Sequence, residues 1–367
     1  MDDISTRLLD LAIAIQQIPA PTFHETDRAE FVRKCFIDEG LADVEMDPLG
    51  NVYARLVGSG SEKMLVVSAH LDTVFPPNVD LQVVREPGRI QAPGIGDNSL
   101  GVAALLGLLW ALRQRNLSLP GDLWLVANVG EEGLGNLCGM RSVVDHFGSG
   151  PLAYLVLEGM ALGQVYHRGL GVRRYRLTVR TPGGHPWVDH GRPSAIHELT
   201  ALSTRIAALD LPRTPRTTLN IGVISGGSSV NTIAAEAMLE LDLRSENTEM
   251  LEALVGQVEK LIHSAQKPGI TVEKEIIGER PPGELSAEHP LVKLAQDCLH
   301  AAGIEPHLNI GSTDANLPLS RSIPSITIGL TTGGRGHTVH EYINLPLLEK
   351  GLEQLLQLVS RVWDIVE

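Results

Sequence analysis

The stretch LWLVANVGEEGLGN, residues 123–136, places an apolar run directly before two adjacent acidic residues. The run is apolar enough to form a buried strand. Glu131 and Glu132 follow it, and two like charges this close cost stability unless something positive lies beside them. The flanking glycines let the backbone approach another group closely. The stretch therefore predicts a buried strand that ends beside a metal ion, an arginine or a functional site.

Similar apolar segments lie on both sides of this strand. Strands are expected at residues 63–70 and 152–159, and helices at residues 99–115 and near Cys138 lie between them. This alternation predicts an α/β fold in which a mainly parallel sheet carries helices on both faces. Functional residues of such sheets gather at the carboxyl ends of the strands. Further helices are expected before Pro19 and at residues 25–39, 291–302 and 346–366, and further strands at residues 51–58 and 325–330.

The sequence changes in character from about residue 170. GVRRYRLTVRT alternates charged and apolar residues, as a half-exposed strand does. The order expected after it is βαββαβ, with helices at residues 194–209 and 249–265, which predicts a ferredoxin-like α+β unit with an antiparallel sheet. After the turn-rich GERPPGEL, helices and apolar strands like those before residue 170 are expected again. Because 367 residues are many for one core, we expect one domain formed by residues 1–168 and 282–367, with a second domain, residues 169–281, inserted in it.

Charge and composition restrict the classes of partner. The formal net charge of -14 argues against nucleic acid and anionic membranes. Cys35, Cys138 and Cys298 lie far apart without CxxC spacing, as free thiols of a reducing compartment do. The first residues lack the pattern of a secretory signal, and the apolar run at residues 101–112 is too short to cross a bilayer. We therefore expect a cytoplasmic protein that binds small ligands.

Candidate functional side chains follow the predicted strands. His70 and Asp72 end the strand at residues 63–70 on one face, and a carboxylate beside a histidine orients a metal ligand or a general base. A buried histidine beside a solvated aspartate is equally compatible with this spacing. Asp97 lies in the glycine-rich GIGDNSLG ahead of a helix. A phosphate loop is disfavoured there, because Ser99 occupies a position that needs glycine and Asp97 would repel phosphate.

More acidic and histidine residues follow other strands. Glu131 and Glu132 point in different directions, so one can bind a metal while the other faces a water molecule; a solvated turn is the alternative. Glu158 follows another apolar strand, and His337 and His340 lie near the C-terminus. Two histidines, one aspartate and two glutamates suit zinc, cobalt or manganese. Five such ligands exceed the needs of one catalytic zinc, whereas two metals about 3.5–4 Å apart that share a carboxylate fit them.

Together these motifs resemble the M20 clan of zinc amidohydrolases and peptidases, which includes tripeptide aminopeptidases, carboxypeptidases, aminoacylases and succinyl-diaminopimelate desuccinylases. The resemblance spans nearly the whole chain, through SAHLDTV, GIGDNSLG, GEEG, LEG, GGHPW, VNTI, LDLRS, STDAN and HTVHEY in that order. It implies a zinc-exopeptidase-like catalytic domain, an inserted lid and dimerisation domain, a homodimer and two divalent metal ions, of which zinc is expected and cobalt or manganese is possible.

The resemblance also implies a role for each matching residue. His70, Asp97 and Glu158 would bind one metal, and Glu132, His337 and the same Asp97 the other. Asp72 would orient His70, and Glu131 would be the general base that activates a metal-bridging water. His337 is preferred to His340 as a ligand because it lies four residues before Glu341, as the ligand does in the family.

Three residues of the inserted domain complete the expected site. The resemblance makes His185 the donor to the developing oxyanion, supplied across the subunit interface in dimeric members; a plain surface histidine is the alternative. Arg244 would take a substrate carboxylate, for which its planar guanidinium is suited. Asn231 would contact the substrate. Both of these residues could instead be structural.

The sequence gives conflicting indications of the substrate. Many relatives have a lysine where this chain has Ser99. Glu158 matches the acylases and carboxypeptidases, whereas aminopeptidases tend to have aspartate there, yet GGHPWVDHGRPSAIHEL resembles the peptidases. We expect a dizinc metallopeptidase that hydrolyses short peptides. An N-acyl amino acid deacylase with the same site is the alternative, and a non-catalytic metal-binding homologue is the third possibility.

Overall fold

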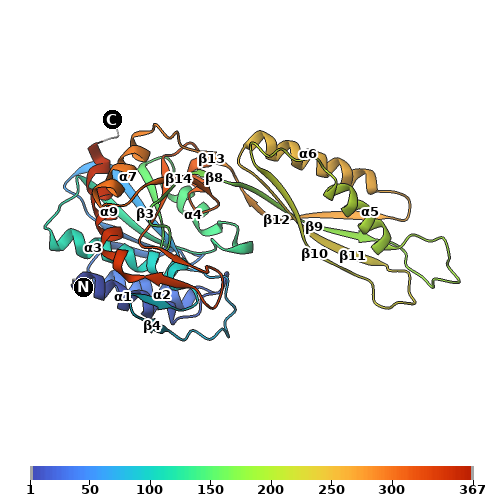
Figure 1. Ribbon diagram of the computed structural model, residues 1–367, viewed down its shortest axis with the longest axis horizontal. Helices are drawn as coiled ribbons and strands as arrows, with labels where there is room; N and C mark the ends of the chain where they lie inside the picture. Colours follow the sequence, from blue (N-terminus) through green and yellow to red (C-terminus); the bar gives the residue numbers. More distant parts are fainter. Residues whose placement is uncertain (1–2, 365–367) are drawn as a thin grey trace. The chain divides into compact units, whose positions relative to one another are not determined.

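The chain divides into two compact units in a computed structural model that describes residues 3–364 (Figure 1). Unit 1 comprises Met1–Gly169 and Gly283–Glu367, and unit 2 comprises Leu170–Pro282. At each junction these bounds differ by one residue from the ranges expected from the sequence. Unit 2 is thus a continuous segment between the two parts of unit 1.

Unit 1 is built on a sheet of order β1-β2-β6-β3-β7-β15-β8-β13, with β14 beside β8. The central strands β6, β3, β7 and β15 are parallel, so their carboxyl ends lie at one edge. Strands β1, β2 and β13 pair antiparallel toward the sides of the sheet. The strands are β1 (Ala42–Met46), β2 (Val52–Leu56), β3 (Ser61–His70), β6 (Gly121–Asn128), β7 (Pro151–Glu158), β8 (Gln164–Gly169), β13 (Gly283–Glu284), β14 (His307–Gly311) and β15 (Ser325–Gly329).

Helices cover both faces of this sheet. On β3, Leu65 and Val67 belong to a core shared with α1, α3, α7 and α9, whereas Val66 points to the opposite core, shared with α4 and α8. This alternation follows from the two-residue period of a strand. It confirms the predicted α/β class with a mainly parallel sheet. The helices are α1 (Asp3–Gln16), α2 (Thr26–Asp38), α3 (Gly101–Gln114), α4 (Cys138–Phe147), α7 (Pro290–Ala301), α8 (Asn316–Ser320) and α9 (Leu348–Arg361).

An apolar stretch longer than residues 101–112 includes α3. Ile95–Gln114, 20 residues, is long and apolar enough by length and composition to cross a membrane, but Asp97 and Asn98 within it are not helical and α3 itself has 14 residues. However, 94% of this apolar stretch is buried inside the protein. Such burial is typical of a core helix, and the Leu8 side chain of α1 packs closely against it at Gly107, where a Cβ would lie 3.0 Å from Leu8 Cδ1.

A small sheet of order β16-β17-β5-β4 was not predicted. Its strands are β4 (Val84–Glu86), β5 (Arg89–Gln91), β16 (Gly333–Gly334) and β17 (Tyr342–Asn344). The loop between β16 and β17 carries His337, and β5 comes just before the turn that carries Asp97. The pairing of β5 with β17 therefore brings two distant segments of the chain together near the expected metal ligands.

Unit 2 has an antiparallel sheet of order β10-β11-β9-β12. Tyr175, Leu177 and Val179 of β9 are buried in a core formed with the helices α5 and α6. On the other face Arg176 lies 2.9 Å from Glu240 and 3.0 Å from Glu275. The strand order and the helices on one face are those of the predicted ferredoxin-like unit. The elements are β9 (Gly171–Arg180), α5 (Ala195–Ala207), β10 (Thr217–Gly226), β11 (Glu236–Ser245), α6 (Thr248–Ala265) and β12 (Thr271–Arg280).

Candidate metal centre

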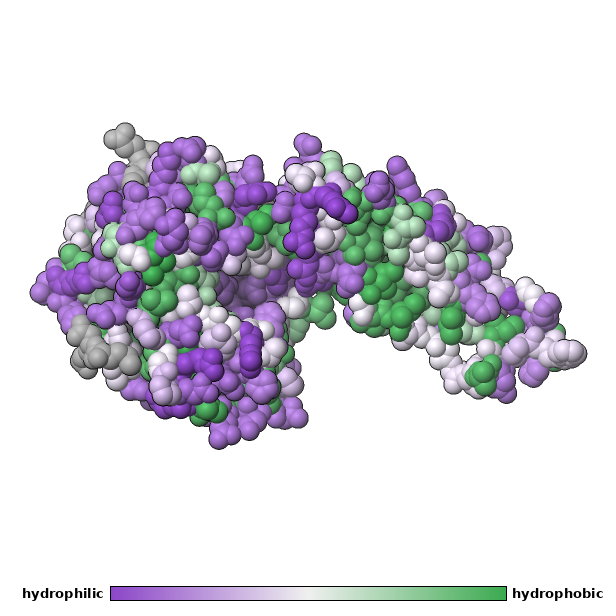
Figure 2. All heavy atoms as spheres, viewed as in Figure 1, coloured by the Kyte–Doolittle hydropathy of each residue, from purple (hydrophilic) through white to green (hydrophobic). Residues whose placement is uncertain are grey.

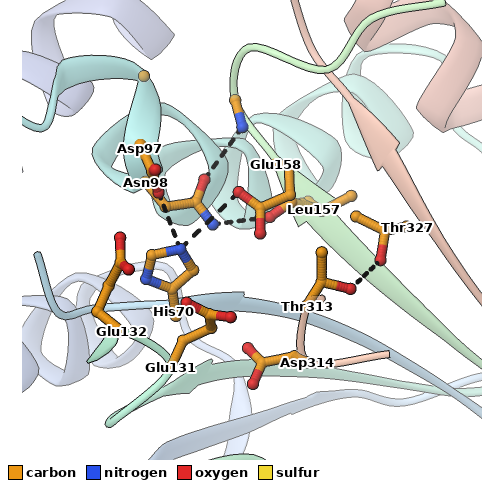
Figure 3. A network of polar contacts seen from close by, with 12 residues as sticks. His70, Asp97, Asn98, Glu131, Glu132, Leu157, Glu158, Thr313, Asp314 and Thr327 are labelled. Carbon is orange, nitrogen blue, oxygen red and sulfur yellow. Dashed lines mark hydrogen bonds and ion pairs between the residues drawn. The ribbon is translucent and has the colours of Figure 1, made fainter. Parts of the chain in front are cut away.

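Two groups of side chains that could hold a metal ion lie at the carboxyl edge of the parallel strands of unit 1. Figure 3 labels their members other than His337. The first is His70, Asp97 and Glu158, and the second is Asp97, Glu132 and His337. Within each group one ligand atom of every residue lies within 4.8 Å of the others. Asp97 belongs to both groups. The structure thus brings together all five residues that the resemblance assigned to metal binding.

The two oxygens of Asp97 face different histidines. Asp97 Oδ1 lies 3.1 Å from His70 Nε2, and Asp97 Oδ2 lies 3.0 Å from His337 Nε2. His337 Nε2 is also 3.1 Å from Glu132 Oε1, and His70 Nε2 is 3.8 Å from Glu158 Oε2. A carboxylate placed in this way, with one oxygen toward each group, has the geometry of a bridging ligand.

Burial and the two histidines perturb the acidic groups of the cluster. Burial raises the pKa of Glu158 to about 7, although the nearby His70 opposes this shift. Burial also acts to raise the pKa of Asp97, but hydrogen bonds from His337 and His70 outweigh it and lower that pKa. Hydrogen bonds to Asp97 and Glu132 raise the pKa of His337 to about 11. Three carboxylates gathered in a largely buried place, with imidazole nitrogens between them, form the mixed oxygen and nitrogen donor set that zinc, cobalt and manganese accept.

Asp72 fixes the backbone that carries the two adjacent glutamates. Its Oδ1 accepts a hydrogen bond from the Glu131 amide at 2.9 Å and its Oδ2 one from the Glu132 amide at 2.8 Å. His70 Nδ1 lies 3.0 Å from the backbone carbonyl oxygen of Asp72 and 3.5 Å from Asp72 Oδ1, which leaves His70 Nε2 to face the ligand group. Burial acts to raise the pKa of Asp72, but the hydrogen bonds from His70 and the two amides outweigh it and lower that pKa. The Asp72 carboxylate therefore positions the backbone of Glu131 and Glu132, and the closest contact of Asp72 with His70 is made by its backbone carbonyl.

Glu131 lies beside the ligands. It is buried, and together with His70 and Glu132 it forms a further group whose ligand atoms lie within 4.8 Å of one another. The preceding Gly130 donates its amide to Glu25 Oε1 at 3.1 Å. The two adjacent glutamates thus follow the end of β6, at a place where ring nitrogens of His70 and His337 lie near them.

Two residues that support Asp97 were missed from the sequence. Glu341 is buried, and its Oε1 accepts hydrogen bonds from the amides of Gly96 and Asp97 at 2.7 and 2.9 Å. Burial and the charge of Asp97 raise the pKa of Glu341 to about 7. Asn98 donates to the Leu157 carbonyl at 2.7 Å and accepts from the Gly159 amide at 3.1 Å. These bonds tie the Asp97 turn to the end of β7, and only the position of Asn98 next to Asp97 could have indicated them.

A buried pair lies close to the same edge. Asn128, the last residue of β6, donates to Asp314 Oδ2 at 2.7 Å, and both residues are buried. Asp314 belongs to the STDAN motif, to which the sequence analysis gave no role. It is drawn with Thr313 in the close-up of the site (Figure 3), and its charge contributes to raising the pKa of Glu158. His340 instead lies beside Gln91, at 3.5 Å from Gln91 Nε2.

Three further candidates belong to unit 2. His185 is exposed, and its Nδ1 accepts hydrogen bonds from the Trp187 and Val188 amides at 3.2 and 3.3 Å. In the neutral ring this leaves Nε2 as the donor. Arg244 donates from Nε to Asp242 Oδ1 at 2.6 Å. Asn231 accepts from Ser229 Oγ at 2.6 Å in an exposed loop. Each is held by residues of its own unit.

Comparisons with known proteins identify one matching family and similar folds. The sequence model of peptidase family M20/M25/M40 matches residues 66–361. The uncharacterized protein YqjE of Bacillus subtilis (strain 168) is 25% identical over 370 residues, which cover 96% of this chain and 98% of that protein. A tripeptidase (SAV1512) from Staphylococcus aureus subsp. aureus mu50 superposes with a TM-score of 0.83 at 23% identity, over 98% of each chain. YxeP of Bacillus subtilis, a dinuclear metal binding peptidase from the M20 family, gives 0.72 at 16% identity over 99% of each chain. At these identities the likeness to the two structures shows the fold.

Proposed function

The chain belongs to peptidase family M20/M25/M40, and on this premise we propose that it is a dinuclear metallopeptidase that hydrolyses amide bonds of short peptides. As a member of this family the protein is a hydrolase, and its His, Asp and Glu groups are of the kind that hold two metal ions. The observation that carries the proposal is that Asp97 belongs to both ligand groups while Glu131 lies in contact range of His70 and Glu132. The tripeptidase SAV1512 supports a peptide substrate by its name and fold.

The proposed ligand assignment follows the two groups. His70 and Glu158 hold one metal, Glu132 and His337 hold the other, and Asp97 bridges them. Two divalent cations bound there would polarise the carbonyl of the scissile amide and make the attacking water more acidic. We propose zinc, and the same donors also accept cobalt or manganese.

Glu131 is the proposed general base. Glu131 comes directly before the proposed ligand Glu132 in the segment that follows β6, and Asp72 accepts the backbone amides of both residues, so the Glu131 carboxylate stays beside the proposed ligands rather than in solvent. It takes the proton of the attacking water and passes it to the nitrogen of the leaving amine. Asp72 acts through His70 and through this backbone, as a positioning residue.

The inserted unit is the proposed lid and dimerisation domain. Strand β10 ends its sheet, and Val223 and Ile224 on it are exposed. A second copy can extend the sheet at such an edge with two-fold symmetry. Trp187 and Val188, which hold His185 Nδ1, are also highly exposed. In the dimer His185 would donate its Nε2 proton to the oxyanion formed at the partner's site.

Arg244 and Asn231 are the proposed substrate-binding residues of the inserted unit. Asp242 takes two donors of the Arg244 guanidinium, Nε at 2.6 Å and Nη2 at 3.2 Å. A guanidinium has five donors, so Asp242 sets its orientation and the others serve a substrate carboxylate. The cytoplasm is the proposed location, since Cys35, Cys138 and Cys298 are free thiols.

The decisive variant for the proposed function is Glu131→Gln. It keeps the size of the side chain and removes the base, so tripeptide hydrolysis is expected to fall at least about a thousandfold while metal content stays at the parental value. Asp80→Asn, an exposed carboxylate bonded to the Gln82 amide, is the matched control. Parental activity in Glu131→Gln would contradict the assignment.

The second candidate is an N-acyl amino acid deacylase, which Glu158 favours because related acylases and carboxypeptidases have glutamate there. Dipeptides, tripeptides and N-acetyl amino acids assayed side by side on the same metal-loaded protein separate the two functions. Faster hydrolysis of every N-acetyl amino acid than of any free peptide would replace the peptidase assignment. Mixing His185→Ala with Glu131→Ala protein tests the dimer, because partial recovery of activity requires sites built from two subunits.

A further inference from the structure

Phe23 is held in an unfavourable conformation on the surface of unit 1. Its φ is +74°, in the left-handed region that residues with a bulky side chain rarely adopt. The residue is also 62% exposed, so its ring gains little from packing in the protein. Neither local conformational preference nor burial explains a phenylalanine at this position. Strained backbone of this kind tends to occur where a function requires it.

Two connections fix Phe23 to the catalytic backbone. The neighbouring Thr22 donates its hydroxyl to Asp72 Oδ2 at 2.9 Å, and Asp72 in turn accepts the amides of Glu131 and Glu132. The backbone of Phe23 is hydrogen-bonded to the Glu25 carboxyl, which also accepts the Gly130 amide at 3.1 Å. Phe23 is therefore fastened on one side to Asp72 and on the other to the residue before the proposed general base.

Other exposed apolar residues lie on the loops that carry the site. Val74, Leu134 and Val339 each come two residues after Asp72, Glu132 and His337 respectively, and each is 41–51% exposed. We call these three residues together with Phe23 the apolar rim. On the face of unit 1 seen in Figure 2, hydrophilic residues cover most of the surface and apolar residues form small separate patches. Single exposed apolar side chains are ordinary, but the rim residues share connections to one site.

The proposed reaction indicates which part of the substrate contacts the apolar rim. Hydrolysis requires the scissile amide at the ligand groups, and successive Cα atoms of a peptide are only about 3.8 Å apart. The side chains that flank the scissile amide must therefore lie against the loops that carry Asp72, Glu132 and His337. Among the rim residues Phe23 has the largest apolar surface, and its backbone is the one held in the left-handed region.

We propose that Phe23 is a specificity-determining residue whose ring packs against an apolar side chain next to the scissile amide, so that the preferred substrates are short peptides with a large apolar residue there. This inference rests on the proposed function, since it assumes that a peptide is the substrate. The left-handed backbone of Phe23 turns its ring outward at a fixed place, and Glu25 and Thr22 hold that place relative to Glu131.

The first test compares leucine with alanine in otherwise identical tripeptides, at the residues on each side of the hydrolysed bond. Phe23→Asn removes the ring with a residue that tolerates a left-handed backbone, and Phe23→Leu keeps an apolar side chain. We expect the parent to favour leucine in kcat/KM, Phe23→Asn to reduce this preference about tenfold, and Phe23→Leu to restore most of it. Leu117→Ala is the control, because it removes an exposed apolar side chain just beyond the C-terminal end of α3, which is the end away from Asp97.

The second test does not depend on turnover. Leucine hydroxamate and glycine hydroxamate are titrated into metal-loaded protein by calorimetry, and the ratio of their dissociation constants is measured for the same variants. A parental preference for leucine hydroxamate that is lost in Phe23→Asn supports the inference even if no amide is hydrolysed, in which case the peptidase assignment alone fails. Equal binding of the two hydroxamates by the parent, or an unchanged ratio in Phe23→Asn, overturns the inference whatever the activity.

Discussion

Replacement of Asp72 by asparagine tests how much of the site depends on one buried carboxylate. The side chain of Asp72 accepts hydrogen bonds from the amides of Glu131 and Glu132 and from the Thr22 hydroxyl, at 2.8–2.9 Å, and lies beside His70. Asparagine keeps one oxygen, so one of the two buried amides would face an NH2 group. A buried donor without an acceptor costs about 1–3 kcal/mol. We therefore expect the free energy of unfolding of Asp72→Asn to fall by about 1–3 kcal/mol.

The same substitution is expected to weaken metal binding. Loss of a residue that orients a metal ligand typically costs about 10–100-fold in metal affinity. The Asp72 carboxylate accepts the amide of the proposed ligand Glu132 at 2.8 Å and lies 3.5 Å from Nδ1 of the proposed ligand His70, whereas the Asp72 backbone carbonyl, 3.0 Å from the same nitrogen, is kept in the variant. Urea denaturation of chelator-treated protein measures the stability, and calorimetric titration with Zn²⁺ measures the affinity. Asp80→Asn, at an exposed aspartate that also accepts a backbone amide, should change stability by no more than about 0.5 kcal/mol. Equal behaviour of the two variants in both assays would refute the positioning role of Asp72.

Three other predictions concern the framework around the site. In Gly159→Ala the added Cβ would lie 2.2 Å from the Gly96 carbonyl oxygen, so we expect a loss of about 1–3 kcal/mol in the free energy of unfolding and weaker Zn²⁺ binding. Urea denaturation and calorimetry measure the two quantities, and Gly256→Ala, where a Cβ has open space, is the control. Parental values for Gly159→Ala would contradict this prediction. Asn98→Ala leaves the Leu157 carbonyl and the Gly159 amide without this partner, so it should lower the melting temperature and Zn²⁺ affinity together, and a fall in neither would show that the tie is dispensable. Burial acts to raise the pKa of Asp47, but hydrogen bonds from Asn51 and Ser142 outweigh it and lower that pKa. Because the unfolded chain then binds the proton at a higher pH than the folded chain, stability falls as pH drops below about 4. The urea midpoint should therefore change less between pH 7 and pH 3.5 in Asp47→Asn than in the parent.

The strands and helices of the core could be predicted because buried elements have long runs of apolar residues. The apolar runs of β3, β6 and β7 are buried along most of their length, and the apolar α3 is buried on nearly all sides. Strands β1 and β14 escaped prediction because they are only partly buried and so lack an apolar run. The two-residue strand β16 is too short to show a pattern.

The proposed ligand residues could be singled out from the sequence because each follows a strand or lies in a recognisable motif. Their supports were not, because they act through pairings between distant segments. Glu341 holds the Gly96 and Asp97 amides from 244 residues or more along the chain, and Asp72 reaches Glu131 across 59 residues. A carboxylate that accepts hydrogen bonds from distant backbone amides cannot be recognised in the sequence, because no fixed spacing relates it to those amides.

The central claim is that Asp97 bridges two metal ions. Its most direct test is the metal content per chain, measured by elemental mass spectrometry on protein purified without added metal, for the parent, Asp97→Ala and the exposed control Asp80→Ala. The account predicts close to two divalent ions per chain in the parent and in Asp80→Ala, and a marked loss in Asp97→Ala. One ion or none in the parent, with no change in Asp97→Ala, would contradict it.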